Sequence, residues 1–568
     1  MAYSFLSAEA LQPALSSDIL SLVLAAATLG VLSHVSIFRS FPVEEYLYGL
    51  LGFYAATVVA IPVAYLSVTE FSLLQVFFRV GCIASAFNTG LASSIAIYRF
   101  FFHRLRRFPG PWPSKLSRFY DTYLAGKSIQ YNVEIAKMHE KYGDFFRTGP
   151  REICIVRKSA VPLLLSAQSK CGKSTFYAQA QTESKYCNIL HTRDFDDHRR
   201  RRKAWDRGFS IKALAIYEPN ITVKADLLIS HIEKNLGQPI DATRWSMFLS
   251  FDIMGNVGFG KEFNNLSTGV EHPGIKAVHD HMALVGTMAH VPWLLNLISH
   301  LPGATSTMAE FFKWCEDEIV QKHKNWDINQ YPRDVVSWLL KAYVEKDVSA
   351  APTATALHED SRAVLVAGSE TTATTLASIL YYLCKHPEVL VKLQRLLDEV
   401  MPAGSSEWAY DKIKNNISYL DDIINETLRL RPVLLTGGYR VTPAEGIQVD
   451  EVYIPGDVNV FVPTQLIQTD ERYYVDAKRF VPERWNEKKY MIQEDAPYFP
   501  FLYGPYICPG KNLALMSLRI SISKLAQLYD IKFAPAETGE LFETKTLDTF
   551  TTTLPPLHVQ FVRRSRGK

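Results

Sequence analysis

A single cysteine, Cys508, lies in a loop rich in glycine, proline and aromatic residues, FLYGPYICPG at positions 501–510. A thiolate can attack a carbonyl, bind iron, or lie buried as a small apolar side chain. No histidine that could serve as a base is near it in the sequence, although a distant one could fold against it. An iron–sulfur cluster would need about three more cysteines nearby, and the sequence has none there. Binding the iron of a haem requires only one thiolate.

The residues around Cys508 suit a metal-binding thiolate. Gly504 and Gly510 would let the backbone approach a macrocycle and turn its amides toward the sulfur. Pro509 suits the first turn of a helix, and residues 511–526 continue with helical apolar spacing. Cys508 is therefore expected at a helix N-terminus, where the positive end of the helix dipole favours a thiolate.

The pattern Phe-x-x-Gly-x-x-x-Cys-x-Gly, at Phe501, Gly504, Cys508 and Gly510, resembles the haem-binding signature of the cytochrome P-450 superfamily. The resemblance implies that Cys508 is the axial iron ligand of heme b and that the other three residues form the cofactor-binding loop. The family usually has Arg or His two residues before the cysteine, to meet a haem propionate, where this chain has Tyr506. A phenol donates one hydrogen bond but carries no positive charge, so the propionate contact at this position is left open.

Cations for the two haem propionates are expected elsewhere in the chain. Residues 197–210 resemble the family's C-helix, and the alignment implies that His198 and Arg202 face a propionate. Their spacing of four residues places both on one helix face, although most cations of this run are expected to face solvent. Arg440 follows the segment after the family's K-helix and is a further propionate candidate, the alternative being a surface charge at a strand end.

A threonine-rich run at residues 365–376 should be a poor helix. Glycine costs about 1 kcal/mol in a helix interior and each threonine several tenths. The run nonetheless lies between apolar helical stretches, with no proline before Pro387. Threonine hydroxyls can bond back to carbonyls and open a gap for water or a small ligand, or the run is simply a buried helix with satisfied hydroxyls.

The same run resembles the family's I-helix signature, Ala/Gly-Gly-x-Asp/Glu-Thr-Thr. The resemblance implies an oxygen pocket at Ala367 and Gly368. It also implies that Glu370 and Thr371 form an acid–alcohol pair that relays protons to dioxygen, because splitting the O–O bond consumes two protons.

Two further motifs imply a structural network. Glu426 and Arg429 are three residues apart and so share one helix face. Residues 482–485 resemble the family's Pro-Glu-Arg-Phe segment, with Trp485 as the last aromatic. Together these segments imply a buried set of Glu426, Arg429 and Arg484 that fixes the core beneath the haem and takes no part in catalysis.

Other patterns that would indicate a different function are weak. Residues 170–174, KCGKS, look like the end of a phosphate-binding loop, but the required earlier glycine is replaced by Ala167. The seven cysteines are scattered, with no Cys-x-x-Cys pair, which argues against a disulfide scaffold and a zinc site. A net charge of +3 gives no case for a nucleic-acid partner.

The elements that would position these residues are predicted from hydrophobic periodicity. Helical spacing covers residues 132–142, 211–234, 307–326, 361–384 and 418–430, and short strand-like runs cover 153–156 and 459–462. The prediction is a mainly α fold with a small β-sheet, and the resemblance implies the cytochrome P-450 fold. Because no second linker or composition break appears, residues 114–568 are expected to form one haem-thiolate catalytic domain.

Three uncharged runs, at residues 19–38, 46–69 and 80–98, are each near the ~20 residues needed to cross a bilayer. No Lys or Arg precedes Arg39, and a basic cluster at residues 103–107 follows the third run. The positive-inside rule then places the N-terminus in the lumen and the body in the cytosol, through three crossings or through one crossing and two interfacial segments. We therefore predict a membrane anchor at residues 1–107, N-terminal transmembrane helices included, and a stiff Pro-rich hinge at residues 108–113.

The resemblance implies a haem-thiolate monooxygenase of the membrane-bound fungal type. It would insert one atom of O2 into a lipophilic organic substrate, with electrons from NADPH through a separate cytochrome reductase. The basic face that meets the reductase would include Lys478 and Lys511. The alternatives are a haem-thiolate isomerase or dehydratase acting on a pre-oxidised substrate, and a non-enzymatic membrane haem sensor. The pair Glu370 and Thr371 counts against both.

The expected location is the endoplasmic reticulum membrane, with the catalytic domain facing the cytosol. The substrate pocket is expected to be lined by residues 177–190, 433–438 and 550–553 and by the I-helix. Because these segments are apolar with some hydroxyls, we expect a membrane-partitioning substrate, such as a terpenoid or polyketide of fungal secondary metabolism. Hydroxylation, epoxidation, desaturation and multi-step oxidation all use the same machinery.

Overall fold

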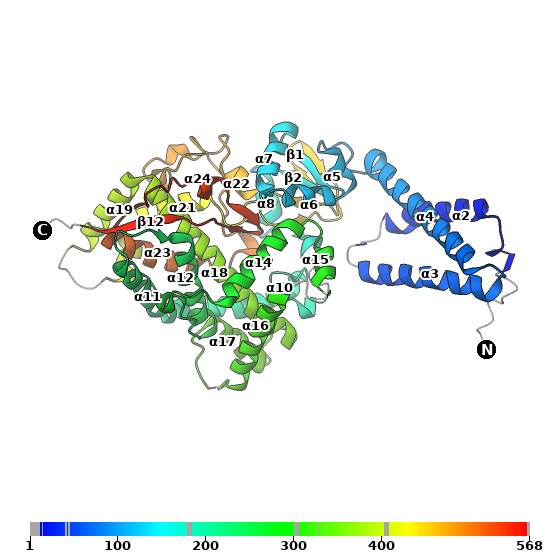
Figure 1. Cartoon of the computed structure of the whole chain (residues 1–568). Coiled ribbons are helices and arrows are strands. Elements are labelled where there is room, and N and C mark those ends of the chain that lie inside the picture. The colour runs from blue at the N-terminus through cyan, green and yellow to red at the C-terminus, as the bar shows by residue number, and fades with distance from the viewer. Residues whose placement is uncertain are drawn as a thin grey trace. The chain divides into compact units, whose positions relative to one another are not determined.

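The computed structural model describes residues 12–13, 15–39, 43, 46–178, 184–299, 301, 306–327, 329–402 and 408–564. The chain divides into two compact units, the first formed by residues 1–118 with 147–151, and the second by residues 119–146 with 152–568 (Figure 1). The predicted hinge, residues 108–113, therefore belongs to the first unit.

Long apolar helices dominate the first unit. It contains α2 (Ile19–Ser33) with the π-helical turn η1 (His34–Phe38), α3 (Leu47–Val68), α4 (Leu73–Ile97) with the π-helical turn η2 (Tyr98–Phe102), and the short α5 (Trp112–Leu116). By length and composition, residues 19–38, 47–68 and 73–102 could each cross a membrane. No more than 17% of the most apolar window of any of them is buried, so most of their apolar side chains are free to face lipid.

Two glycines bring α2 and α4 into backbone contact. A Cβ at Gly30 would lie 2.2 Å from the Phe87 carbonyl oxygen, and one at Gly90 would lie 2.2 Å from the Ala27 carbonyl oxygen. Since any side chain would push the helices apart, these are the small residues that membrane helices use at close crossings.

Helix α4 begins seven residues before the predicted span 80–98 and includes Arg79. The guanidinium of Arg79 donates to the Ser17 carbonyl at 2.9 Å and lies 4.4 Å from the centre of the Phe71 ring. The helix extends through this charge because the long side chain finds a polar partner and an aromatic face near the helix start.

The predicted Pro-rich link is partly helical. Helix α5 begins at Trp112, with Pro113 in its first turn, where a missing N–H costs no hydrogen bond. The fully buried Arg147 donates to four backbone carbonyls within the same unit, those of Arg99, Lys115, Gly149 and Pro150. These bonds fix the link against the end of the third apolar helix.

The second unit is mainly helical, as predicted. Its α-helices are α6 (Phe119–Gly126), α7 (Tyr131–Tyr142), α8 (Ala160–Leu165), α9 (Thr175–Ala178), α10 (Phe195–Gly208), α11 (Ile211–Lys234), α12 (Ala242–Ile253), α13 (Asn265–Thr268), α14 (Pro273–Met288), α15 (Pro292–Ser299), α16 (Ser306–Lys324), α17 (Val335–Val344), α18 (Ala354–Lys385), α19 (Pro387–Val400), α20 (Tyr410–Asn416), α21 (Ser418–Leu430), α22 (Thr464–Gln468), α23 (Lys511–Leu528) and α24 (Glu540–Thr544). Its other helical turns are η3 (Ser184–Tyr186), η4 (Met254–Phe259), η5 (Pro482–Trp485), η6 (Lys489–Met491) and η7 (Gly504–Tyr506).

The strands are short and form small sheets. They are β1 (Phe145–Gly149), β2 (Glu152–Ile155), β3 (Gly172–Lys173), β4 (Ile240–Asp241), β5 (Arg440–Val441), β6 (Ile447–Val449), β7 (Val452–Ile454), β8 (Asn459–Phe461), β9 (Tyr529–Phe533), β10 (Leu547–Thr549), β11 (Thr551–Thr553) and β12 (His558–Arg563). The largest sheet has the order β1-β2-β8-β5-β3, in which β5 runs antiparallel to both β8 and β3. The smaller sheets are β4-β12-β9, β10-β11 and β6-β7.

Helix α18 is the central helix of the second unit and packs against α12, α16, α17, α21 and α23 (Figure 1). It begins where the Thr353 side chain accepts from the Ala356 N–H, and it ends just before Pro387. It is long and apolar enough to cross a membrane, but 72% of its apolar window is buried, which makes it a core helix. Its hydroxyls bond back to carbonyls four residues earlier, from Ser369, Thr371 and Thr375, and the α-helix continues unbroken through them.

Candidate active site

The Cys508 loop joins η7 to α23. The Cys508 N–H donates to the Phe501 carbonyl at 2.9 Å, which closes the loop, and α23 begins at Lys511 with Gly510 as its N-cap. Cys508 is solvent-accessible, whereas the other six cysteines are buried or partly buried. The protein packed around the thiol raises the pKa of Cys508, while the backbone N–H groups of Gly510 and Lys511 and the Arg202 guanidinium act to lower it. N–H groups that favour the charged form of the sulfur are expected around a thiolate ligand.

The surroundings of the two loop glycines, Gly504 and Gly510, differ in whether they require glycine. Gly504 has φ +70°, and a Cβ there would lie 2.2 Å from the Leu165 carbonyl oxygen, so no other residue fits. At Gly510 a Cβ would meet Phe209 at 3.7 Å and the Cys508 sulfur at 3.9 Å, both ordinary contact distances. Protein atoms therefore explain the glycine at 504 but not the one at 510.

Three basic residues surround the ring of Tyr506. His198 of α10 meets it edge to face with ring centroids 4.7 Å apart, and the guanidinium carbon of Arg440 lies 5.0 Å from its centre. The third, Lys173 of β3, has its Nζ 4.9 Å from the same ring centre and was not predicted as a site residue. Nothing in the local sequence distinguishes Lys173 from a surface lysine, because its burial follows from the long-range pairing of β3 with β5.

This basic cluster is buried without a matching negative charge. Lys173 and Arg440 are 4% and 2% exposed. Lys173 donates to the carbonyls of Ile189 and Leu190, Arg440 donates to the Tyr439 carbonyl, and the Nε of Arg440 has no partner. Among the described residues, neither cation forms an ion pair with a carboxylate. Such a donor set fits a ligand that carries carboxylates of its own, as the haem propionates do.

The two residues predicted on α10 behave differently. Burial, and next the charge of Lys173, lower the pKa of His198 to about 3, so its ring is neutral beside Tyr506. Arg202 donates to the Ile507 carbonyl at 2.5 Å and to Asp206 at 2.7 Å. Arg202 thus supports the Cys508 loop with two of its three guanidinium nitrogens, and its propionate contact stays a prediction.

The predicted oxygen-pocket residues on α18 also differ from each other. The Ala367 carbonyl accepts the Thr371 hydroxyl at 2.6 Å. A Cβ at Gly368 would lie 2.5 Å from the sulfur of Met254, the first residue of η4. The glycine is therefore required for close packing of η4 against α18, whatever role it has toward oxygen.

Glu370 is buried and accepts a hydrogen bond from β11, whereas its neighbour Thr371 donates within α18. One carboxylate oxygen accepts from the Thr551 hydroxyl of β11 at 2.5 Å, and the other has no partner. Burial raises the pKa of Glu370 to about 7, although the hydrogen bond from Thr551 acts to lower it. A carboxyl with this pKa can both hold and release a proton near neutral pH.

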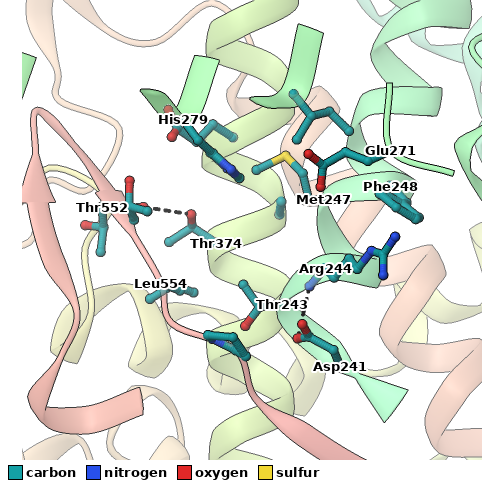
Figure 2. A pocket seen from close by; sticks show the side chains of 15 residues that line it. Asp241, Thr243, Arg244, Met247, Phe248, Glu271, His279, Thr374, Thr552 and Leu554 are labelled. Atoms are coloured by element: carbon teal, nitrogen blue, oxygen red, sulfur yellow. Dashed lines mark hydrogen bonds between the residues drawn. The ribbon is translucent and has the colours of Figure 1, made fainter. Parts of the chain in front are cut away.

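Glu370 lines a cavity of about 200 Å³ between α12, α14, α18 and the chain that follows β11 (Figure 2). Other titratable side chains on its walls are Asp241, Glu271 and His279, and Figure 2 shows the Thr374 hydroxyl bonded to Thr552 at its edge. The cavity has the size and the polar groups to hold several water molecules beside the Glu370 carboxyl.

Glu426, Arg429 and Arg484 come together in a fully buried network, each with a side chain 0% exposed. One Glu426 oxygen accepts from Arg429 at 2.8 Å, from Arg484 at 2.8 Å and from the Val481 N–H at 3.0 Å. The other accepts from Arg429 at 2.9 Å and from the Trp485 indole at 3.1 Å. Both guanidiniums also donate to backbone carbonyls, so a single carboxylate organises the segment 475–485.

Parts of the predicted substrate-pocket lining meet beside Glu370. The Thr552 N–H donates to the Val433 carbonyl at 2.9 Å, which joins the 550–553 and 433–438 segments. Phe550, between β10 and β11, has φ +77° and stacks on Phe176 with ring centroids 5.9 Å apart. A bulky residue in this backbone region is uncommon and often lies at a functional site. Of the predicted segment 177–190, residues 179–183 lie outside the described part of the chain.

Comparison with known proteins identifies the family. Residues 109–561 match the family model described as Cytochrome P450. The chain is 35% identical over 541 residues to Cytochrome P450 monooxygenase FCK2 of Fusarium pseudograminearum, covering 94% of this chain and 97% of that protein. It is 31% identical over 465 residues to Tryprostatin B 6-hydroxylase of Aspergillus fumigatus, covering 81% of each.

A solved structure shares the fold. The crystal structure of the cytochrome P450 CYP102L1 superposes with a TM-score of 0.63 at 20% identity, covering 76% of this chain and 94% of that one. The haem-thiolate cofactor expected from the sequence is that of this family, and the buried cations around Tyr506 suit its propionates. The chain therefore belongs to the cytochrome P450 family.

Proposed function

We propose that this haem-thiolate monooxygenase binds its haem iron through Cys508, relays protons through Glu370 and Thr371, and oxidises a lipophilic secondary metabolite. The observation that carries the proposal is the Cys508 loop, in which the backbone N–H groups of Gly510 and Lys511 act to lower the pKa of an accessible thiol beside a buried basic cluster. When bound, the haem supplies iron for the activation of O2, and a thiolate ligand donates the electron density that favours O–O cleavage.

The protein's own part in this chemistry is to hold the sulfur and to move protons. Helix α23 presents its N-terminal N–H groups to Cys508, and Arg202 holds the loop through the Ile507 carbonyl. Glu370 takes a proton from the cavity beside it and releases it toward the Thr371 side of α18. The unpartnered oxygen of its carboxyl and its pKa of about 7 support this role.

Replacing Glu370 with glutamine should lower NADPH-dependent product formation by about 100-fold, because general acid catalysis is typically worth 10²–10⁴-fold. The native rate should also fall as the pH rises through about 7, where the Glu370 carboxyl loses the proton that it delivers. The variant cannot ionise at this position and should lose that pH dependence. Steady-state rates between pH 6 and 8.5, roughly one unit or more on each side of this pKa, measure both effects.

Glu359→Gln is the matched control, because Glu359 lies on the same helix and forms a partly buried ion pair with Arg362. It should keep the native rate and pH profile. A Glu370→Gln enzyme with the native rate and the native pH profile would remove Glu370 from the proton path.

The proposed substrate is a lipophilic secondary metabolite of the terpenoid or polyketide type. Two observations support a lipophilic compound, the apolar lining around Phe550 and the three helices that could hold the enzyme in a membrane where such compounds concentrate. The relative from Aspergillus fumigatus is named as a 6-hydroxylase of tryprostatin B. Its name is consistent with hydroxylation of a small molecule as the reaction of the present chain.

The proposed partners are an NADPH–cytochrome reductase and membrane lipid, and the proposed location is the endoplasmic reticulum. The first Lys or Arg of the chain is Arg39, and basic residues cluster after the third apolar helix. This asymmetry supports three crossings with the catalytic unit in the cytosol. Lys511, at the start of α23, and Lys478 are the proposed reductase contacts.

The test is turnover of the purified full-length chain with a membrane reductase, NADPH and O2, while candidate precursors are supplied. The proposal expects NADPH and O2 to be consumed together, with one oxygen atom from O2 found in the product. Conversion of a pre-oxidised substrate without O2 or NADPH would favour an isomerase or dehydratase instead. Haem binding with no turnover of any precursor class would favour a sensor, and the monooxygenase relatives argue against both.

A further inference from the structure

Lys173 and Arg440 are direct neighbours across two paired strands. Strand β3 runs antiparallel to β5, and the register places Lys173 opposite Arg440. Like charges directly opposite in a sheet are destabilising, and burial makes the repulsion stronger. Both side chains are nevertheless buried, and both lie against the ring of Tyr506. An anion that interacts with both side chains would relieve this repulsion.

Among the residues that the structure describes, no carboxylate forms an ion pair with Lys173 or Arg440. The charge of Asp197 on α10 acts on Lys173, but this carboxylate is already paired with Arg200 at 2.6 Å and with Arg201 at 3.3 Å. Arg201 is also paired with the buried Asp360 at 2.7 Å. Lys173 itself uses two of its three N–H bonds on the carbonyls of Ile189 and Leu190, at 2.8 Å and 2.7 Å. One donor of Lys173 and the Nε of Arg440 remain for a ligand.

We propose that Lys173 binds a haem propionate and replaces the basic side chain that this chain lacks two residues before Cys508. Tyr506 fills the space of that side chain and presents its ring face to both cations, with Lys173 Nζ at 4.9 Å and the Arg440 guanidinium carbon at 5.0 Å. The positive charge thus comes from strand β3 and not from the cysteine loop, but it still lies beside that loop. The inference rests on haem binding by this chain.

A purely structural role is the competing explanation. Lys173 could serve only to tie the segment at Ile189 and Leu190 to the sheet through its two carbonyl bonds. Propionate binding and this structural role can be told apart, because a cation placed at another position could restore only the first. A charge reintroduced at position 506 could meet the propionate, but it would leave the Ile189 and Leu190 carbonyls without their donor.

The decisive experiment measures haem release from the full-length holoprotein to excess apomyoglobin. Lys173→Met keeps the apolar stem and removes the charge, and it should release haem roughly 10- to 100-fold faster, as loss of a charge-assisted hydrogen bond predicts. The haem reduction potential of this variant should become more negative, because a nearby positive charge stabilises the ferrous state. Lys173→Arg should remain close to the native protein in both measurements.

Two further variants separate ligand binding from folding. Lys170→Met, three residues earlier, removes an exposed lysine paired with Glu445 and should change neither quantity. Adding Tyr506→Arg to Lys173→Met should restore slow haem release and shift the potential back toward the native value. A Lys173→Met protein with the native release rate and potential would overturn the proposal, as would a double variant with no recovery of either.

The readout is independent of which residue ligates the iron. A native holoprotein without the spectrum of a thiolate-bound haem would refute the assignment of Cys508, yet haem release would still report the propionate contact of Lys173. The two proposals can therefore fail separately.

Discussion

Replacing Cys508 with serine is expected to reduce monooxygenase turnover to background. A hydroxyl has neither the electron density nor the affinity for iron of a thiolate, so the push that favours O–O cleavage is lost. The buried basic cluster around Tyr506 remains, and the variant should still take up some haem through its propionates. Product formation with reductase and NADPH, measured per haem bound, is the quantity to compare with the native enzyme.

Cys315→Ala is the matched control, because Cys315 is a buried cysteine on α16, outside the proposed site. It should reduce stability slightly and leave turnover per haem unchanged. Turnover by Cys508→Ser at the native rate per haem would contradict the assignment of Cys508 as the iron ligand.

Replacing Glu426 with alanine should give protein that contains no haem and is poorly recovered. The substitution leaves two guanidiniums buried without their carboxylate, and breaking such a set costs roughly 3–5 kcal/mol. That is a large part of the ~5–15 kcal/mol that stabilises an ordinary domain. The segment 475–485 would lose its organising acceptor, and we propose that the core beneath the haem loses its shape with it. Haem content per chain and the midpoint of thermal unfolding are the measurements.

Glu487→Ala provides the comparison, since Glu487 forms an ion pair with Lys392 in which its own side chain is 57% exposed. Exposed pairs are worth ~0–1 kcal/mol, so this variant should keep its haem. A Glu426→Ala protein recovered with a full complement of haem would show that the network is dispensable.

Local sequence patterns predicted most of the fold because long amphipathic helices are encoded locally. The helices predicted at 211–234 and 418–430 are α11 and α21 with the same bounds. Helix α18 begins seven residues earlier than the predicted 361–384, since Thr353 supplies an N-cap that the apolar period alone does not reveal. The third apolar helix is longer than the uncharged run because Arg79 is satisfied within its own unit.

The residues of the site were predictable where a motif marks them and not where tertiary pairing creates them. Cys508, Glu370 and Glu426 each lie in a motif, and the structure gives them the loop, the burial and the partners described above. Lys173 lies in a run that looked like a broken phosphate-binding loop, and only the pairing of β3 with β5 buries it. Gly368 was expected to serve oxygen, whereas its contact with Met254 is a demand of helix packing that no linear pattern shows.

The most direct test of the whole account is the absorption spectrum of the purified native protein, reduced and exposed to carbon monoxide. A haem held by the sulfur of Cys508 should give the strongly red-shifted Soret band that a thiolate ligand produces. A Soret band at the position seen for haem with a nitrogen ligand, or no haem spectrum after reconstitution, would contradict the account.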